Sequence, residues 1–270
     1  MKMRVITAAV LLPLLLLVLL IAPKIVAALV FGLLFAIAAY EMLYRTHLVT
    51  HVRLVFYSAV MAFTMSIWSY FGGRPATGML CFMVFGVVLF SEMMLDHVRV
   101  RFEMLAMCFV AGYLVPYMLS AVIRILAQPL GRYLVLIPFV VGFLSDAGAY
   151  IVGKRFGKHK LSPVVSPNKT LEGSLGGIVT AIVGMILYAV ILHFLKFRVN
   201  YLIAILYGFL GSLAGSFGDL SFSVIKRQTG LKDYGNLIPG HGGVLDRFDS
   251  MVMVAPLTEA LLISLPVAVS

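Results

Sequence analysis

Runs of about twenty apolar residues recur along the whole of this chain. A helix of that length crosses the roughly 30 Å hydrocarbon core of a bilayer. The composition agrees, because 62% of the 270 residues are hydrophobic and only 12% are charged, against about 25% charged in soluble domains. Mean hydropathy is +1.06. We therefore expect an all-α fold, a polytopic integral membrane bundle of about nine transmembrane helices.

The apolar runs set the expected spans. They cover about 5–22, 25–42, 54–72, 77–95, 104–126, 133–152, 174–195, 200–220 and 250–268. The first run could belong to a secretory signal, but it is too long for an ordinary signal core and no clear small-residue cleavage site follows. We expect N-terminal transmembrane helices in residues 1–130. Residues 131–270 should form a C-terminal catalytic transmembrane region with cytoplasmic loops at 153–173 and 221–249.

The basic residues predict the orientation of the chain. With the N-terminus inside, 15 of the 21 Lys and Arg residues fall on the inner side. Cytoplasmic loops of membrane proteins carry such an excess. We therefore expect a multi-pass protein of the cell inner (plasma) membrane, with its N-terminus and both long polar loops in the cytoplasm. Positive loops facing anionic lipid account for the net charge of +10, so the expected partner is the lipid bilayer and no nucleic acid.

Four aspartates are placed where apolar spans meet polar loops. Asp146 and Asp219 lie inside expected spans, and Asp246 and Asp249 lie at the start of the last one. Ionisable residues within spans are costly and are functional candidates by default. Asp246 and Asp249, three residues apart, would share one face of a helix. The sequence thus predicts carboxylates from three spans at one level, beneath a basic cytoplasmic rim.

Such a carboxylate cluster needs positive charge, because neighbouring carboxylates repel one another. Mg²⁺ would supply it, since this ion typically binds one or two carboxylates together with substrate phosphates. Nearby basic residues suit phosphate groups: Lys226, Arg227, Lys232 and Arg247. Backbone amides of the glycine-rich run 239–243 could also approach an anion closely. The pattern indicates metal-assisted phosphate chemistry at the inner membrane boundary.

Plainer interpretations stay open for several of these residues. Asp249 can be a carboxylate that stabilises a helix start, and the basic residues can be ordinary inner-side charges. His241 can be a loop residue without catalytic duty. Gly211 and Gly215 have the spacing of close helix packing. Asp219, deep in a span, is the hardest to explain without a function.

The polar segment before the last span carries a long motif. It reads Ser223-x-Ile225-Lys226-Arg227-x4-Lys232-Asp233-x-Gly235-x2-Ile238-Pro239-x-His241-Gly242-Gly243-Val244-x-Asp246-Arg247-Phe248-Asp249. This motif resembles the signature of phosphatidate cytidylyltransferases, also called CDP-diacylglycerol synthases. The upstream segment SDAGAYIVGKRFGKHKLSPVVSPNKTLEGSLGG is similar to that family's second polar block, with Asn168 where a basic residue is expected and Lys169 beside it. The first five spans match only as generic hydrophobic helices.

The resemblance implies a reaction in which CTP and phosphatidate give CDP-diacylglycerol and pyrophosphate. Mg²⁺ would be required, and a second, monovalent cation such as K⁺ is left open, as is a homodimer. The expected catalytic residues are Asp219, Asp246, Asp249, Lys226 and Arg247. The expected metal ligands are Asp219, Asp246, Asp249 and Asp146. The expected substrate-binding residues are Lys226, Arg227, Lys232, His241, Gly242, Gly243, Arg247, Lys169 and Ser223.

Three other functions compete with this one. A CDP-alcohol phosphotransferase would carry the pattern DxxDGxxAR…GxxxDxxxD, but Asp246-x-x-Asp249 is followed here by Ser250-Met251. A lipid kinase that uses CTP would transfer the γ-phosphate instead. A cation-coupled transporter usually shows internal repeats and broken helices. No convincing repeat is present, and only Glu259 suits that alternative.

Overall fold

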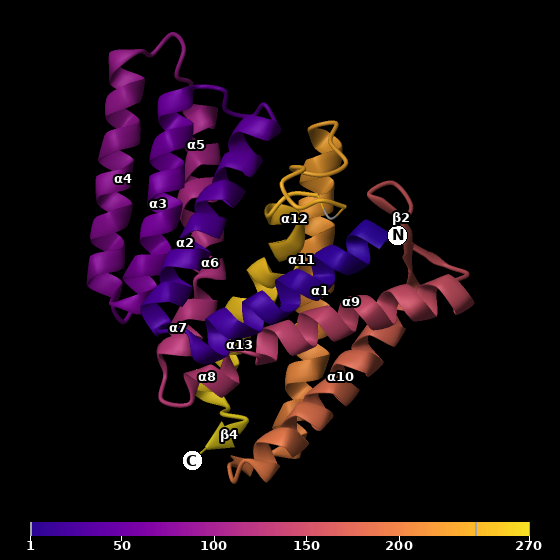
Figure 1. The fold of residues 1–270 in the computed structure, drawn as a ribbon. Helices are drawn as coiled ribbons and strands as arrows, with labels where there is room; N and C mark the ends of the chain where they lie inside the picture. The colour runs from indigo at the N-terminus through magenta and orange to yellow at the C-terminus, as the bar shows by residue number, and fades with distance from the viewer. Residues whose placement is uncertain (1, 241, 270) are drawn as a thin grey trace. The chain divides into compact units, whose positions relative to one another are not determined.

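The computed structural model describes residues 2–240 and 242–269, and nearly all of its regular structure is helical (Figure 1). Contacts within the chain divide it into two compact units. The first consists of Met1–Ala127 and Gln228–Phe248, and the second consists of Gln128–Arg227 and Asp249–Ser270. Each unit thus combines one long stretch of chain with a short segment from near the C-terminus.

The first unit is built from apolar helices. Its elements are α1 (Lys2–Leu16), η1 (Leu17–Ile21), α2 (Lys24–Tyr40), η2 (Glu41–Arg45), α3 (Val52–Tyr70), α4 (Pro75–Leu95), α5 (Phe102–Phe109), η3 (Val110–Leu114), α6 (Val115–Leu119), α7 (Ala121–Ala127) and α12 (Leu245–Phe248). The three η segments are π-helical turns that continue the helices before them. Helices α2 and α3 pack along one another, and Ser66 Oγ donates a hydrogen bond to the Ala28 carbonyl oxygen (2.7 Å).

The second unit is organised around two long helices that lie side by side. Its elements are α8 (Gly131–Leu134), α9 (Ile137–Phe156), β1 (Lys160–Ser162), β2 (Ser166–Thr170), α10 (Leu171–Phe194), β3 (Arg198–Val199), α11 (Tyr201–Gln228), α13 (Met251–Ser264) and β4 (Ala268–Val269). Helices α9 and α10 approach closely because small residues line their contact. A Cβ at Gly177 would come within 2.8 Å of the Ser145 carbonyl oxygen, so a larger residue would push the helices apart.

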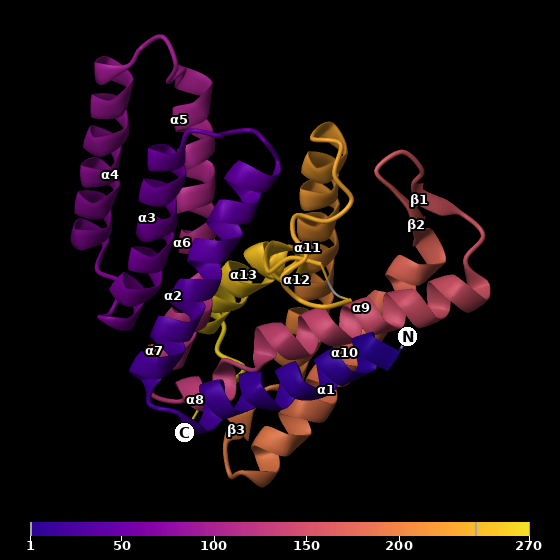
Figure 2. The same cartoon turned by 45° about the horizontal axis from the view of Figure 1, so that its top comes forward.

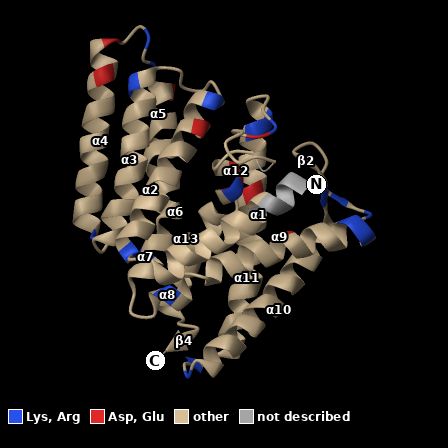
Figure 3. Cartoon of the chain, in the orientation of Figure 1, with Lys and Arg blue, Asp and Glu red and all other residues tan. Residues whose placement is uncertain are grey.

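In the part of the chain that the structure describes, seven helical segments are long and apolar enough to cross a membrane. They are Lys24–Arg45, Val52–Tyr70, Pro75–Leu95, Phe102–Ala127, Gly131–Phe156, Leu171–Phe194 and Tyr201–Gln228. They match the second to eighth expected spans, and Figure 3 shows Lys and Arg concentrated at helix ends and in loops. The expectation of an all-α, polytopic membrane protein is therefore confirmed.

The apolar runs at the two ends of the chain differ in length as helices. At the N-terminal end, α1 and η1 run without a break from Lys2 to Ile21, over the expected first span, whereas α13 at the other end has only 14 residues. At 1.5 Å per residue α13 is about 21 Å long, less than the roughly 30 Å hydrocarbon core. It ends before Leu265 because the following residue, Pro266, disfavours helical backbone at that position. Beyond it, β4 pairs with β3.

The expected loop 153–173 is an ordered hairpin rather than an irregular segment. Strands β1 and β2 pair in antiparallel fashion between the ends of α9 and α10 (Figure 2). The Glu172 carboxylate accepts hydrogen bonds from the backbone N–H groups of Lys158 and His159. Thr170 Oγ1 accepts one from Gly173 N (3.1 Å) and caps α10. These bonds fix both ends of the hairpin.

Helix α11 runs eight residues beyond the span expected at 200–220. Phe222, Ser223 and Lys226 are buried along this extension, so the helix keeps a packed face after the apolar run has ended. It stops just before Gly230, whose φ of +70° is the left-handed backbone that commonly follows a helix end. Residues 221–228 of the expected loop are therefore helical.

Candidate functional site

One face of α11 carries a row of polar side chains. Asp219, Ser223 and Lys226 are spaced i, i+4 and i+7, which places them on one side of a helix. Ser223 Oγ donates a hydrogen bond to Asp219 Oδ1 (3.3 Å). Ser223 and Lys226 are both buried. A lysine kept out of water on an apolar helix requires a partner of opposite charge.

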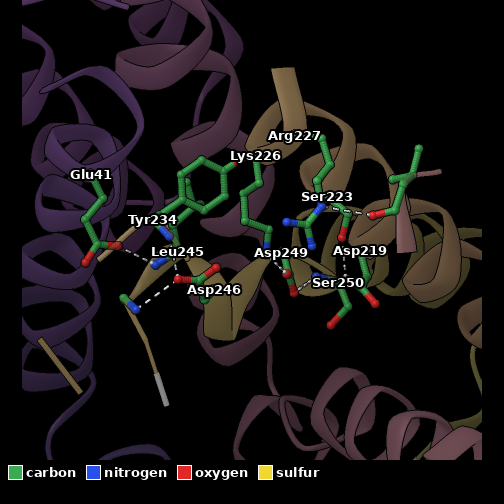
Figure 4. A network of polar contacts seen from close by, with 12 residues as sticks. Glu41, Asp219, Ser223, Lys226, Arg227, Tyr234, Leu245, Asp246, Asp249 and Ser250 are labelled. Carbon is green, nitrogen blue, oxygen red and sulfur yellow. Dashed lines mark hydrogen bonds and ion pairs between the residues drawn. The ribbon is translucent and has the colours of Figure 1, made fainter. Parts of the chain in front are cut away.

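That partner is Asp249, at the turn before α13. Its Oδ2 atom lies 3.6 Å from Lys226 Nζ, and its Oδ1 accepts a hydrogen bond from Ser250 N (2.8 Å). Both side chains are nearly inaccessible, at 10% exposure for Lys226 and 12% for Asp249. Figure 4 shows Asp219, Ser223 and Lys226 facing Asp249 and Ser250. The second unit thus holds two carboxylates and one ammonium group in a cluster in which Asp249 and Lys226 are buried and Asp219 is partly exposed.

Glycines on α11 allow this close approach. A Cβ at Gly218 would come within 2.8 Å of the Asp249 carbonyl oxygen, and one at Gly215 within 3.2 Å of Val254 Cγ2. Gly211 likewise packs on Val141. The packing interpretation of Gly211 and Gly215 is therefore confirmed. Gly218, which the sequence did not single out, is the glycine that lets the turn at Asp249 lie against α11.

The β1–β2 hairpin adds two further contacts to α11. Lys169 of β2 forms an ion pair with Asp219, and Arg227 Nε donates a hydrogen bond to the Val165 carbonyl oxygen (3.2 Å). Lys169 and Asp219 are each about one quarter exposed, so this pair lies at the edge of the cluster. Asp219 is consequently bordered by one ammonium group from the hairpin and one hydroxyl from its own helix.

The carboxylates of the cluster repel one another. Burial raises the pKa of the Asp249 carboxyl to about 7, and the charge of Asp219 adds to that rise while Lys226 opposes it. Asp146, on an exposed part of α9, contributes a smaller rise to the same pKa. A divalent cation would relieve this repulsion.

The donor set fits Mg²⁺ that arrives with a phosphate substrate. Within residues 2–240 and 242–269, no three His, Cys, Asp or Glu side chains converge as a metal cage. Mg²⁺ does not need one, because it typically takes one or two carboxylates and completes its shell with substrate phosphates and water. Asp219 and Asp249 are the two carboxylates best placed for it, and Lys169 and Lys226 flank them.

In the first unit, the loop between α11 and α13 is organised by Asp246. Its Oδ2 atom accepts hydrogen bonds from Tyr234 N (2.8 Å) and Gly243 N (2.9 Å). Gly242 has a φ of +85°, and a Cβ there would lie 2.9 Å from the same oxygen. Only glycine fits both the backbone and the space at this position. The Gly243 amide is therefore engaged with Asp246 and would need to leave it before binding a phosphate.

The same loop encloses a hollow of about 580 Å³, a size typical of small-molecule sites. It is lined by Lys232, Asp233, Gly235, Asn236, Ile238, Gly240, Gly242 and Arg247. Three expected substrate-binding residues, Lys232, Gly242 and Arg247, thus meet around one cavity. His241 lies outside the described residues.

Asp246 and Asp249 do not share a continuous helix, contrary to the expectation from their spacing. Helix α12 ends at Phe248 and α13 begins at Met251. The Asp249 side chain bonds the next amide, that of Ser250, and this local bond competes with helix formation. The two aspartates consequently have different surroundings: Asp246 is bound by loop amides, and Asp249 lies beside Lys226.

Glu41 is the polar residue that sequence reasoning missed. It is 3% exposed, and its carboxylate accepts hydrogen bonds from Val244 N (3.1 Å) and Leu245 N (2.8 Å), as Figure 4 shows for Leu245. The signal was available in the sequence, since Glu41 is an acidic residue at the end of a long apolar run. What the sequence lacked was any sign of its partners.

Comparison with known proteins identifies the family of the chain. The pattern of the cytidylyltransferase family matches residues 2–265. The chain belongs to the cytidylyltransferase family. It is 47% identical over 135 residues to the phosphatidate cytidylyltransferase of Staphylococcus haemolyticus, covering 50% of this chain and 51% of that protein. The Staphylococcus aureus enzyme of the same name is 47% identical over 133 residues, covering 49% and 50%. The aligned part of the chain spans about half the length of these relatives.

Proposed function

We propose that this chain transfers the cytidylyl group of CTP to phosphatidate, giving CDP-diacylglycerol and pyrophosphate in phospholipid biosynthesis. The observation that carries the proposal is the cluster of Asp219, Asp249 and Lys226, which joins acidic and basic groups at the end of a membrane-length helix. A lipid phosphate and a nucleoside triphosphate are both anionic. A site at the membrane boundary can receive the first from the bilayer and the second from water. The names of the staphylococcal relatives point to the same reaction.

The reaction exchanges one phosphorus–oxygen bond for another. An oxygen of the phosphatidate phosphate attacks the α-phosphorus of CTP in line with the leaving group. The bond from that phosphorus to the oxygen bridging to the β-phosphorus breaks, and pyrophosphate departs with that oxygen. Near neutral pH the phosphatidate oxygen is already largely ionised, so the step needs no strong general base.

The residues of the chain bind and orient the two substrates. Lys232 and Arg247 line the hollow of the first unit and suit the phosphates of CTP. Lys226 and Lys169 lie beside the carboxylates of the second unit, where their positive charge suits a phosphate group. Arg227 anchors the hairpin through its hydrogen bond to the Val165 carbonyl oxygen, and its guanidinium group is of the kind that binds phosphate.

Asp219 and Asp249 would hold Mg²⁺, with Asp246 and Asp146 as further candidate ligands. When bound, the ion would neutralise charge on the phosphoryl oxygens and favour in-line displacement. Asp249 must lose its proton to bind a cation, and Lys226 assists by stabilising the charged form. A second, monovalent cation would meet the same carboxylates.

We further propose that the protein lies in the cell inner (plasma) membrane and that the site opens to the cytoplasm. The excess of basic residues on that side supports this orientation. CTP then reaches the site from water, while phosphatidate reaches it within the inner leaflet.

The decisive experiment follows the label of CTP in detergent solution. Purified protein is incubated with Mg²⁺, phosphatidate and CTP labelled on either the α- or the γ-phosphate. We expect the α-label in the lipid product and the γ-label in pyrophosphate. A γ-label in the lipid would identify a kinase. If no product forms in detergent and the protein moves cations across vesicle membranes, it is a transporter.

Asp246→Asn should abolish product formation in a folded protein, and near-normal turnover would refute a role of Asp246 in the reaction.

A further inference from the structure

Glu41 lies where α2 gives way to the π-helical turn η2. Its side chain is withdrawn from solvent at 3% exposure. Single π-helical turns within helices occur often at functional sites, because they rotate one side chain out of the regular helical register. A buried carboxylate is retained only when donors satisfy it. The donors of Glu41 therefore indicate its role.

Both carboxylate oxygens of Glu41 bind the start of α12. Oε1 accepts from Val244 N at 3.1 Å, and Oε2 accepts from Leu245 N at 2.8 Å. Hydrogen bonds from amides to a carboxylate are stronger than those between neutral groups. Because two adjacent amides are bound by the two oxygens of one group, the direction of the peptide chain at this point is fixed.

Two glycines leave room for the carboxylate. A Cβ at Gly243 would lie 2.5 Å from Oε2 and 2.6 Å from Oε1 of Glu41, and a Cβ at Gly235 would collide with Oε1. The loop backbone thus closes around Glu41 on two sides. Neither glycine has Glu41 as a neighbour in sequence, so this fit is a property of the folded unit.

The contacts of Glu41 continue directly into those of Asp246. Gly243 N donates to Asp246 Oδ2, while the next two amides donate to Glu41. Three consecutive amides are therefore held by two carboxylates. Helix α12 has only four residues, too few for an isolated helix to be stable in water. Its orientation depends on these bonds.

We propose that Glu41 is a positioning residue of the reaction. By holding the start of α12, it sets the orientation of Asp246 and Arg247, which belong to that helix. Glu41 itself touches neither substrate. The inference rests on the proposed function, and it assigns a role in the reaction to a helix outside the motif that suggested that function.

The test is the variant Glu41→Gln in the full-length protein. The amide keeps the shape of the side chain but replaces one acceptor with an NH₂ group, which would face a backbone N–H. We expect kcat to fall about 100-fold, because displacing a catalytic group by roughly 1 Å has effects of that size. The KM for CTP should also rise, because Arg247 is proposed to bind the phosphates of CTP, but by a smaller factor than the fall in kcat.

Glu92→Gln is the matched control. Glu92 is also a buried glutamate of the first unit, and its carboxylate contacts Tyr57 Oη (2.9 Å) and Arg53 Nη1 (3.7 Å). We expect its kcat to stay within about threefold of the wild type, because its hydrogen bond and its ion pair are made with α3 and not with the loop. If Glu41→Gln does not fold, Glu41→Asp keeps the charge but draws it back from the amides. A folded Asp variant with unchanged kcat would overturn the proposal.

Hydrogen exchange gives a readout that does not depend on turnover. In Glu41→Gln the amides of residues 243–246 should exchange at least about tenfold faster than in the wild type, while α3 and α4 stay protected. Unchanged exchange, or a lower melting temperature with full kcat per folded molecule, would refute a positioning role. If the wild type forms no CDP-diacylglycerol, the proposed function fails instead, and the exchange result still tests the contact itself.

Discussion

Lys169 and Asp219 form an ion pair that joins the β1–β2 hairpin to α11. The hairpin therefore supplies a positive charge to one of the two carboxylates proposed to hold Mg²⁺. An ammonium group and a divalent cation cannot both be fully bound by the same carboxylate. We infer that Lys169 gives up part of this contact when the cation binds and turns toward the phosphates of CTP.

Replacing Lys169 by Met should change the two affinities in opposite directions. The concentration of Mg²⁺ needed for half-maximal rate should fall about threefold, because a partly exposed ion pair of roughly 0.7 kcal/mol no longer competes for Asp219. The KM for CTP should rise about tenfold, as expected for the loss of a hydrogen bond to a charged group. Initial rates measured over a matrix of Mg²⁺ and CTP concentrations separate the two effects.

Lys160→Met provides the control for that experiment. Lys160 is an exposed residue of β1, so its replacement removes the same charge from the same hairpin away from Asp219. Both constants should stay unchanged in this variant. Equal changes in the two variants would mean that only the total charge of the hairpin matters, and the specific role of Lys169 would be rejected.

The elevated pKa of Asp249 predicts a pH-dependent affinity for Mg²⁺. Burial and the charge of Asp219 raise this pKa to about 7, so below that pH the carboxyl is largely neutral. A cation must then displace the proton, and its affinity should increase as the pH rises from 6 to about 8 and level off above. Calorimetric titration with Mg²⁺ in buffers of different ionisation enthalpy should show proton release at pH 6 and little at pH 8.

Asp249→Asn is the informative variant for this prediction. It removes the titrating group while preserving the size of the side chain, so both the proton release and the pH dependence of binding should disappear. A pH dependence that persists in Asp249→Asn would assign the proton to another group and contradict the role given to Asp249.

The ion pair between Lys226 and Asp249 should be visible in a double-mutant cycle of stability. Removing one partner leaves a buried charge without compensation, at a cost of about 3 kcal/mol. Lys226→Met and Asp249→Asn together should therefore be less destabilising than the sum of the single changes, with a coupling energy of about 1–3 kcal/mol. Thermal unfolding in detergent without Mg²⁺ measures the cycle, and strict additivity would show that the two groups do not interact.

The sequence singled out Asp219, Ser223 and Lys226 as candidate site residues, but it did not predict that they share one helix, because residues 221–228 were expected to belong to a loop. They lie on one face of α11 because the helix continues to Gln228 and a helical period relates them. The long apolar runs were predicted as helices from their length and composition, and seven of the nine form membrane-length helices in the described residues. The hairpin was missed because β1 and β2 are short and the segment contains Pro163 and Pro167, which are uncommon inside strands.

Contacts between distant parts of the sequence could not be predicted. Nothing in the spacing of Glu41 indicates that its carboxylate would meet Val244 and Leu245, because that contact exists only after the first unit has folded. The same holds for Lys169 and Asp219. A single sequence identifies ionisable residues that are costly to bury, but it does not identify their partners, which depend on packing. Here the packing depends in part on glycines, whose positions in the sequence do not indicate which side chains will approach them.

Gly218→Ala tests whether that packing controls catalysis. A Cβ at this position would lie 2.8 Å from the Asp249 carbonyl oxygen, a backbone atom that cannot rotate away. The turn that carries Asp249 should therefore move away from α11. We expect kcat to fall at least tenfold, because misplacing a catalytic group by roughly 1 Å slows a reaction by that much or more.

Gly142→Ala is the control, because a Cβ there would meet Met251 Sδ at an ordinary contact distance of 3.5 Å. Circular dichroism should show equal helix content in both variants. If Gly218→Ala matches Gly142→Ala in kcat, the close approach of Asp249 to α11 has no part in the reaction, and the metal site must be sought elsewhere.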